Sequence, residues 1–114
     1  TTTGVIRFGK ATDETKTAIA VSNIDLALGS VYSKTISAAT TFTLSNKSGT
    51  TDLVQSFILE LTNPGAFAIT WWSGVKWDKG TAPTWTVAGV DIVGFYSYDM
   101  GVTWRGILLA QDSK

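Results

Sequence analysis

The sequence predicts an all-β protein, and three observations lead to that class. Apolar and polar residues alternate in short runs; from Gln55 to Thr62, the apolar residues Phe57, Leu59 and Leu61 fall on one side. Turn-forming residues such as Gly, Asn and Pro separate these runs, and no stretch sustains an apolar period of 3.6 residues. About eight short strands without a long helical pattern predict one antiparallel β-sandwich domain of the jelly-roll type.

The N-terminal part is the least regular. Thr3 to Gly9 can form an edge strand or a connector, the hydrophilic Lys10 to Thr17 predicts an exposed loop, and Ala18 to Ala27 predicts irregular structure or a strand. We therefore interpret residues 1–24 as an N-terminal segment or a connector to an upstream region, and residues 25–114 as the β-sandwich domain. No low-complexity tract, linker or internal repeat divides the chain further.

Two strands are expected before residue 55. Val31 to Ile36 alternates in period two, and Thr41 to Leu44 alternates again with Phe42 and Leu44 pointing inward. This alternation is typical of strands with one face on a core. The polar stretch from Asn46 to Asp52 predicts a loop.

The stretch from Ser56 to Asp99 holds four of the five tryptophans and supplies most of the large apolar surface. We expect the other strands of the domain to be arranged around this stretch. Its second strand candidate runs from Ala66 to Trp72, with Phe67, Ile69 and Trp71 in phase. That phase predicts that these three side chains share one face of a strand.

The C-terminal third completes the sheet. Val75 to Trp77 predicts a further short strand, and a turn-rich stretch from Asp78 to Thr84 follows it. Asp91 to Tyr98 is dense in β-branched and aromatic residues, which favour strands. Asp99-Met100-Gly101 predicts a hairpin turn, and Trp104 to Ala110 predicts the last strand.

The composition excludes several classes of function. Nine basic and nine acidic residues give a net charge of zero, whereas a nucleic-acid footprint needs a clustered excess of Lys and Arg. No apolar run approaches the roughly 20 residues that span a bilayer, so we expect no membrane insertion. The chain has no cysteine and no histidine, which excludes thiolate catalysis, Ser-His-Asp sites and Cys- or His-based metal sites.

Paired carboxylates are the remaining route to hydrolysis, and Asp78, Asp91 and Asp99 are the candidates. Asp78 precedes Lys-Gly and Asp99 opens a turn, and an aspartate side chain in such a place binds turn amides. We therefore favour a role in turns over catalysis. Asp99 also lacks the dense oxygen-ligand spacing of a calcium loop, so we expect a protein that is no enzyme and binds no cofactor or metal.

The tryptophans are the best candidates for binding. Adjacent residues of a strand point to opposite faces, so Trp72 is expected to face outward if Trp71 joins Phe67 and Ile69 in the core. We favour a core position for Trp71, Phe57 and Phe95. Exposed indoles can stack on a sugar ring or anchor a subunit contact, and interface cores are enriched in aromatic residues. We favour subunit packing over ligand stacking for Trp72, Trp77 and Trp85. Trp104 is open to either role, or to a cation–π pair with Arg105.

Four phrases cover most of the chain, from about Asp25 to Lys114: DLALGSVYSKTISAATTFTLSN, QSFILELTNPGAFAITW, GVKWDKGTAPTWTVAGVDIVGFYSYD and TWRGILLAQDSK. In their order they resemble a recurrent domain of tail-fibre and other tail-appendage proteins of tailed bacteriophages. The matching positions are Val75-Lys76-Trp77, Gly80 to Pro83, Gly89, Asp91, Phe95-Tyr96, Asp99, Gly101 and Thr103-Trp104. The chain departs from the group at Trp72, Trp85, Met100 and Val102, where the group has Pro, Leu, Gly and Thr.

The resemblance implies a structural virion protein, most simply the tip module of a tail fibre. It implies a homotrimer that contacts other virion proteins and a host-surface glycan or protein, and the loops Lys47 to Thr51 and Lys79 to Thr84 could meet that receptor. Two alternatives stay open: a decoration or cement protein of the capsid, and a carbohydrate-binding module that uses Trp72, Trp77 or Trp85 as a stacking platform.

Overall fold

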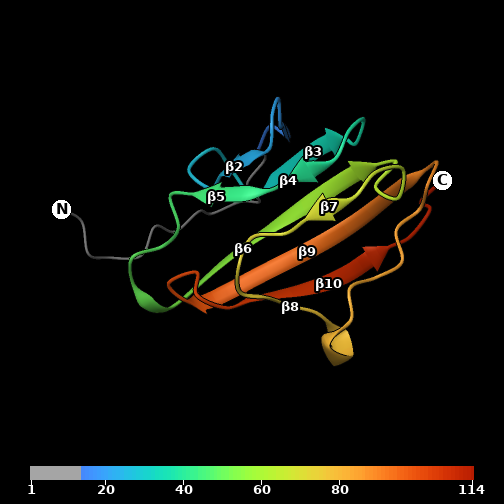
Figure 1. The fold of residues 1–114 in the computed structure, drawn as a ribbon. Coiled ribbons are helices and arrows are strands. Elements are labelled where there is room, and N and C mark those ends of the chain that lie inside the picture. Colours follow the sequence, from blue (N-terminus) through green and yellow to red (C-terminus); the bar gives the residue numbers. More distant parts are fainter. Residues whose placement is uncertain (1–13) are drawn as a thin grey trace.

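Most of the backbone pairing lies in one six-stranded sheet (Figure 1). The computed structural model describes residues 14–114, so the expected segment Thr3 to Gly9 lies outside the described residues. Neighbouring strands follow the order β1 (Thr17–Ala18), β3 (Val31–Thr35), β6 (Thr51–Thr62), β9 (Val90–Asp99), β10 (Trp104–Ala110) and β8 (Val75–Lys76).

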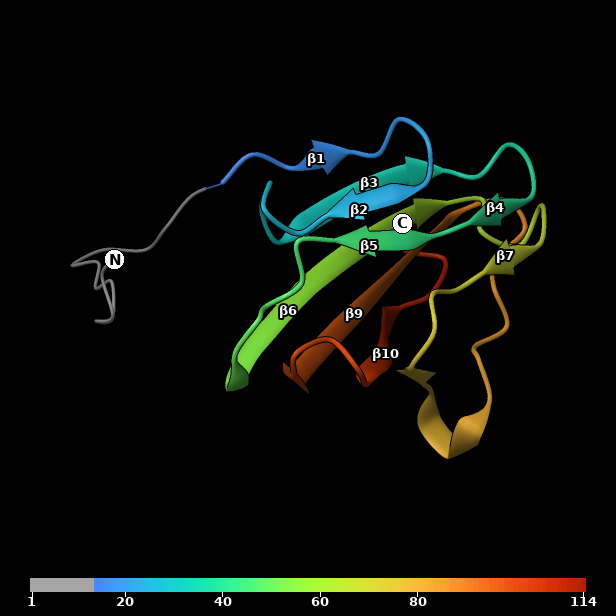
Figure 2. The ribbon, with the colours of Figure 1, turned by 60° about the vertical axis from the view of Figure 1, so that its left-hand side comes forward.

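Two short strand pairs form a second layer over one face of this sheet (Figure 2). One pair joins β2 (Asn23–Asp25) to β5 (Thr43–Ser45), and the other joins β4 (Thr40–Thr41) to β7 (Ile69–Thr70). Within residues 14–114 the one helical piece is a 3-10 turn, η1 (Asp78–Gly80), and no helix there is long and apolar enough to cross a membrane.

The strand pairing is mixed, so the expectation of a purely antiparallel arrangement is wrong. β9 pairs antiparallel with β6 and β10, whereas β3 pairs parallel with β6, and both pairs of the second layer are parallel. The reason lies in the chain path: after β3 the chain crosses into the second layer through β4 and β5, then returns as β6 in the original direction. Parallel neighbours need such a crossover, and alternation in a sequence carries no information about it.

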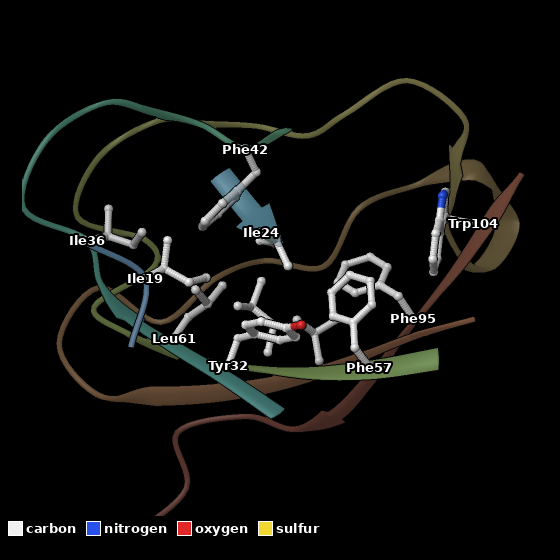
Figure 3. Packing of buried hydrophobic residues seen from close by; sticks show 11 residues of the cluster. Ile19, Ile24, Tyr32, Ile36, Phe42, Phe57, Leu61, Phe95 and Trp104 are labelled. Carbon is white, nitrogen blue, oxygen red and sulfur yellow. The ribbon is translucent and has the colours of Figure 1, made fainter. Parts of the chain in front are cut away.

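The core lies between the two layers, and period-two alternation selects its residues. On β6, Phe57 and Leu59 point inward opposite Phe95 and Val93 of β9. Figure 3 shows Phe57 and Phe95 on the side of the sheet that faces Phe42 and Ile24 of the second layer. The buried apolar residues are Ile19, Ile24, Tyr32, Ile36, Phe42, Phe57, Leu59, Leu61, Val93, Phe95 and Trp104. The expected core positions of Phe42, Phe57 and Phe95 are confirmed.

The described part of the N-terminal segment packs with the rest of the domain. β1 continues the six-stranded sheet beside β3, and Ile19 after it is buried. β2 pairs with β5, and its Ile24 has no exposed surface. Residues 17–24 are thus a structural part of the same β domain.

Two expected strands differ in length from those observed. β6 begins at Thr51, inside the expected Asn46–Asp52 loop, and its first residues form a projecting end with a register shift before Gln55. The strand expected over residues 66–72 is only two residues long. Phe67, expected in phase with Ile69, is 48% exposed, because residues 63–68 form a turn in which the amide of Ala66 donates to the carbonyl of Asn63.

Candidate functional site

An aromatic cluster fills one end of the space between the layers. Its rings contact one another at centroid distances from 4.8 to 6.3 Å. Trp71 lies near its middle and stacks on Phe42 at 5.4 Å with an interplanar angle of 26°. The cluster consists of Tyr32, Phe42, Phe57, Trp71, Trp72, Trp77, Trp85, Phe95 and Trp104. All five tryptophans therefore pack within their own chain.

The expectation that Trp72 faces away from the core is wrong. Its ring lies 4.8 Å from that of Phe95 and 5.8 Å from that of Phe57, and its buried Nε1 has no hydrogen-bond partner in the described chain. The rule of opposite faces holds only inside a strand, and β7 ends at Thr70. Beyond it the backbone turns, so Trp71 and Trp72 can both reach the cluster.

Trp104 is fully buried, which removes it as a stacking or interface residue. Its Nε1 donates to the carbonyl of Gly101 at 3.1 Å and so holds the β9–β10 turn against the core. Arg105, the next residue of β10, is exposed and points to the opposite face of the sheet. The expected cation–π alternative therefore fails for geometric reasons.

A hydrogen-bond network around Asp99 builds the β9–β10 turn. The Oδ1 of Asp99 accepts from the amide of Thr103 and from the hydroxyl of Ser97, both at 2.9 Å. The amide of Gly101 donates to the same hydroxyl at 3.1 Å, and Gly101 has a φ of 77°. The expected turn role of Asp99 is therefore confirmed.

A second network surrounds Asp91 at the other end of β9. This carboxylate has no exposed surface, and it accepts from the amide and hydroxyl of Thr86 at 2.8 and 2.7 Å and from the amide of Asp112 at 2.8 Å. Nearby, the amide of Gly89 donates to the side chain of Asn63 at 3.0 Å. Asp91 and Asp99 lie eight residues apart on one strand, a separation of about 26 Å, so these two cannot act as one carboxylate pair.

A hollow of about 750 Å³ lies beside β10, between that strand and the loop after β8. Its lining includes the candidate residues Trp77 and Arg105, together with Tyr96, Lys76 and Lys79. The structure thus brings two of the five candidates into one site. Of the other three, Trp72 and Trp85 are half-buried in the aromatic cluster and Trp104 is fully buried.

The sheet also exposes apolar side chains on the face away from the second layer, called the outer face below. Ile58, Tyr96, Ile107 and Leu109 line a shallow groove there, and Tyr98 continues it with its ring stacked 6.5 Å from that of Tyr96. All five side chains are more than a third exposed. The sequence signal of this face is the apolar residues at outward-facing alternate positions of β6, β9 and β10, which the prediction from the tryptophans did not include.

No protein-family model matches the chain, and neither does any curated protein or solved structure. The resemblance to phage tail domains therefore stays a prediction from the phrases that carry it.

Proposed function

We propose that this chain is a non-enzymatic structural module of a phage virion, the tip module of a tail fibre, which assembles as a homotrimer and attaches to the host surface. The resemblance supports the virion setting and the trimer. The exposed apolar side chains of the outer face support self-association, because soluble monomers rarely expose a large contiguous apolar patch.

The covering partner that we propose is a second copy of this chain. Besides its apolar residues, the outer face carries Glu60 on β6 and Arg105 on β10, and neither of them forms an ion pair within residues 14–114. In a head-to-tail contact of the apolar residues these two charges lie at the rim, which leaves Arg105 open to the hollow beside β10. Head-to-tail contacts close into a ring, such as a trimer, when the rotation between successive copies closes.

We also propose that the domain is a β-sandwich. Two layers with a core between them support a β-sandwich, in which side chains of the two inner faces interdigitate. The jelly-roll topology stays a prediction, since jelly rolls are built from antiparallel strands and this chain adds parallel pairs.

Multi-angle light scattering on the purified chain tests the assembly. We expect a mass three times that of one chain, independent of dilution over the micromolar range. A monomer at every concentration would contradict the trimer. Cryo-electron microscopy of the source particle then tests the location, because density at the capsid three-fold positions would favour the decoration-protein alternative.

A carbohydrate-binding module is the second candidate function, and the hollow beside β10 favours it. Of the three indoles first considered as a stacking platform, only Trp77 lines this hollow. The hollow shares Tyr96 and Ile107 with the outer face, so a binding role is compatible with a trimeric tail module when the subunit contact leaves the β10 edge open.

A further inference from the structure

The hollow beside β10 forms because most of the outer edge of β10 has no neighbouring strand among residues 14–114. β8 pairs with β10 only at Trp104 and Arg105, and the chain then leaves the sheet through η1. Figures 1 and 2 show this loop projecting away from the sheet. Lys79 and Gly80 turn the loop with φ values of 54° and 75°. The remaining edge of β10 therefore forms one wall of the hollow, and the loop forms the other.

Positive charge gathers in this hollow although the chain as a whole is neutral. Its lining contains the cations Lys76, Lys79 and Arg105 and a single carboxylate, Asp78, which leaves an excess of two positive charges. Within residues 14–114 the only ion pair joins Lys114 to Asp112, so none of the three cations is neutralised by a carboxylate in contact. Such a site attracts an anionic group.

Aromatic rings accompany these cations. Tyr96 is 36% exposed and lines the hollow next to Arg105, its partner across the β9–β10 pair. Trp77 lines it as well, and its ring is fixed from behind by contacts with Trp85 and Phe95. A ring that is held in place offers a flat apolar surface at little entropic cost, which suits the apolar face of a sugar.

We propose that this hollow binds a saccharide that carries an anionic group, a carboxylate or a phosphate. Arg105, Lys76 and Lys79 contact the anionic group, while Tyr96 and Trp77, which lie on opposite faces of the sheet, pack against different sugar rings of the saccharide. The volume lies within the range of about 300–1,000 Å³ that small-molecule sites occupy. The inference rests on the proposed attachment function for the source of this ligand, an acidic glycan of the host surface.

Isothermal titration calorimetry tests the site with three probes: hexagalacturonate, its fully methyl-esterified form, and a phosphorylated oligomannose. We expect binding of one or both anionic probes and none of the neutral ester, which has the same backbone. The affinity should fall when salt is raised from about 0.05 to 0.5 M, because salt screens exposed charges. Binding by hexagalacturonate alone assigns a carboxylate ligand, and binding by the phosphorylated probe alone assigns a phosphate.

Variants locate the binding on the surface. We expect Arg105→Gln and Lys79→Gln each to weaken the affinity about tenfold, as the loss of one charge-assisted hydrogen bond predicts. Lys16→Gln removes an exposed lysine that does not line the hollow and should change the affinity less than about twofold. Equal losses in all three variants would overturn the site and indicate a non-specific charge effect.

The outcomes also separate this inference from the proposed function. A trimer that binds none of the probes overturns the site and leaves the virion module standing, with the cations serving only to keep other strands off the β10 edge. A monomer that binds an anionic probe keeps the site and overturns the trimer.

Discussion

At Gly106 the absence of a side chain makes room for an aromatic ring. An added Cβ would lie 2.5 Å from Cζ3 and 2.7 Å from Cε3 of Trp77, and 3.0 Å from Cε1 of Phe95. These are ring atoms inside the aromatic cluster, so they cannot move away as the end of a flexible side chain can. Gly106 therefore determines where the indole of Trp77 lies, and with it one side of the hollow.

Gly106→Ala should lower the free energy of unfolding by about 1–3 kcal/mol, the usual cost of overpacking a core. Urea denaturation followed by tryptophan fluorescence measures this change. Gly49→Ala is the matched control, because nothing lies within 4 Å of an added Cβ there. The control should be neutral or slightly stabilising. Equal effects of the two substitutions would contradict the tight contact.

Asp91 joins three segments through its carboxylate. Burial raises the pKa of this carboxyl, but the hydrogen bonds from Thr86 and Asp112 outweigh burial, so its pKa lies below the ordinary value. The contribution of Asp91 to stability is therefore complete above the unfolded-state pKa of about 3.9 and is lost as the pH falls through the lower, folded-state pKa.

Asp91→Asn tests this contribution. The variant places an amide group against backbone donors, and we expect a loss of about 2 kcal/mol in unfolding free energy at neutral pH. The difference between the two proteins should shrink below about pH 4 as the wild-type carboxylate is protonated. Hydrogen bonds lower the pKa of Asp99 as well, so both proteins weaken in acid. A difference that stays constant down to pH 2 would refute the titration of Asp91.

At the scale of elements, the β9–β10 hairpin combines a well-bonded turn with a strained residue. Met100 has a φ of 61°, a conformation that costs a residue with a side chain about 1–2 kcal/mol. Its side chain is 43% exposed. A left-handed backbone favours glycine, which has no side chain to strain, at such a position.

Met100→Gly should therefore stabilise the protein. The relief of strain exceeds the extra chain entropy of glycine by about 0.5–1 kcal/mol, and thermal unfolding should show a higher midpoint. Val102→Gly serves as the control in the same turn, since Val102 is exposed and has no positive φ. The control should be destabilising. A lower midpoint for Met100→Gly would show that packing of the methionine side chain outweighs its backbone strain.

At the scale of the whole molecule, the outer face decides whether copies associate. Leu109 is 53% exposed on this face, and its Cδ1 lies 3.2 Å from the position of an added Cβ on Gly94. Leu109→Asp places a charge in the proposed interface. Because the side chain is exposed in a single copy, the substitution should change the unfolding free energy of that copy little. It should strongly weaken the association between copies.

Light scattering should therefore find Leu109→Asp as a folded monomer. Leu28→Asp provides the matched control, because Leu28 is exposed to a similar degree but lies on the loop after β2, away from the outer face. The control should assemble like the wild type. If Leu109→Asp stays a trimer, the copies meet through another surface.

Some features of this molecule follow from local sequence. The alternation of Phe57, Leu59 and Leu61 predicts which side of β6 is buried, because strand geometry alone sends every second side chain to one face. The turn at Asp99 could likewise be predicted, since its hydrogen bonds join residues close in the chain. One β-rich domain and most strand positions between residues 31 and 110 belong to this category.

Other features depend on contacts between distant residues, and local patterns do not encode them. Parallel pairing of β3 with β6 depends on the path through the second layer, and the burial of Trp72 depends on where the chain turns after β7. The hollow arises only when the loop after β8 meets the free edge of β10. The amino-acid sequence by itself determined most of the strands between residues 31 and 110 and the buried face of β6. The tertiary structure alone decided the direction of pairing and which side chains share a site, because both depend on long-range packing.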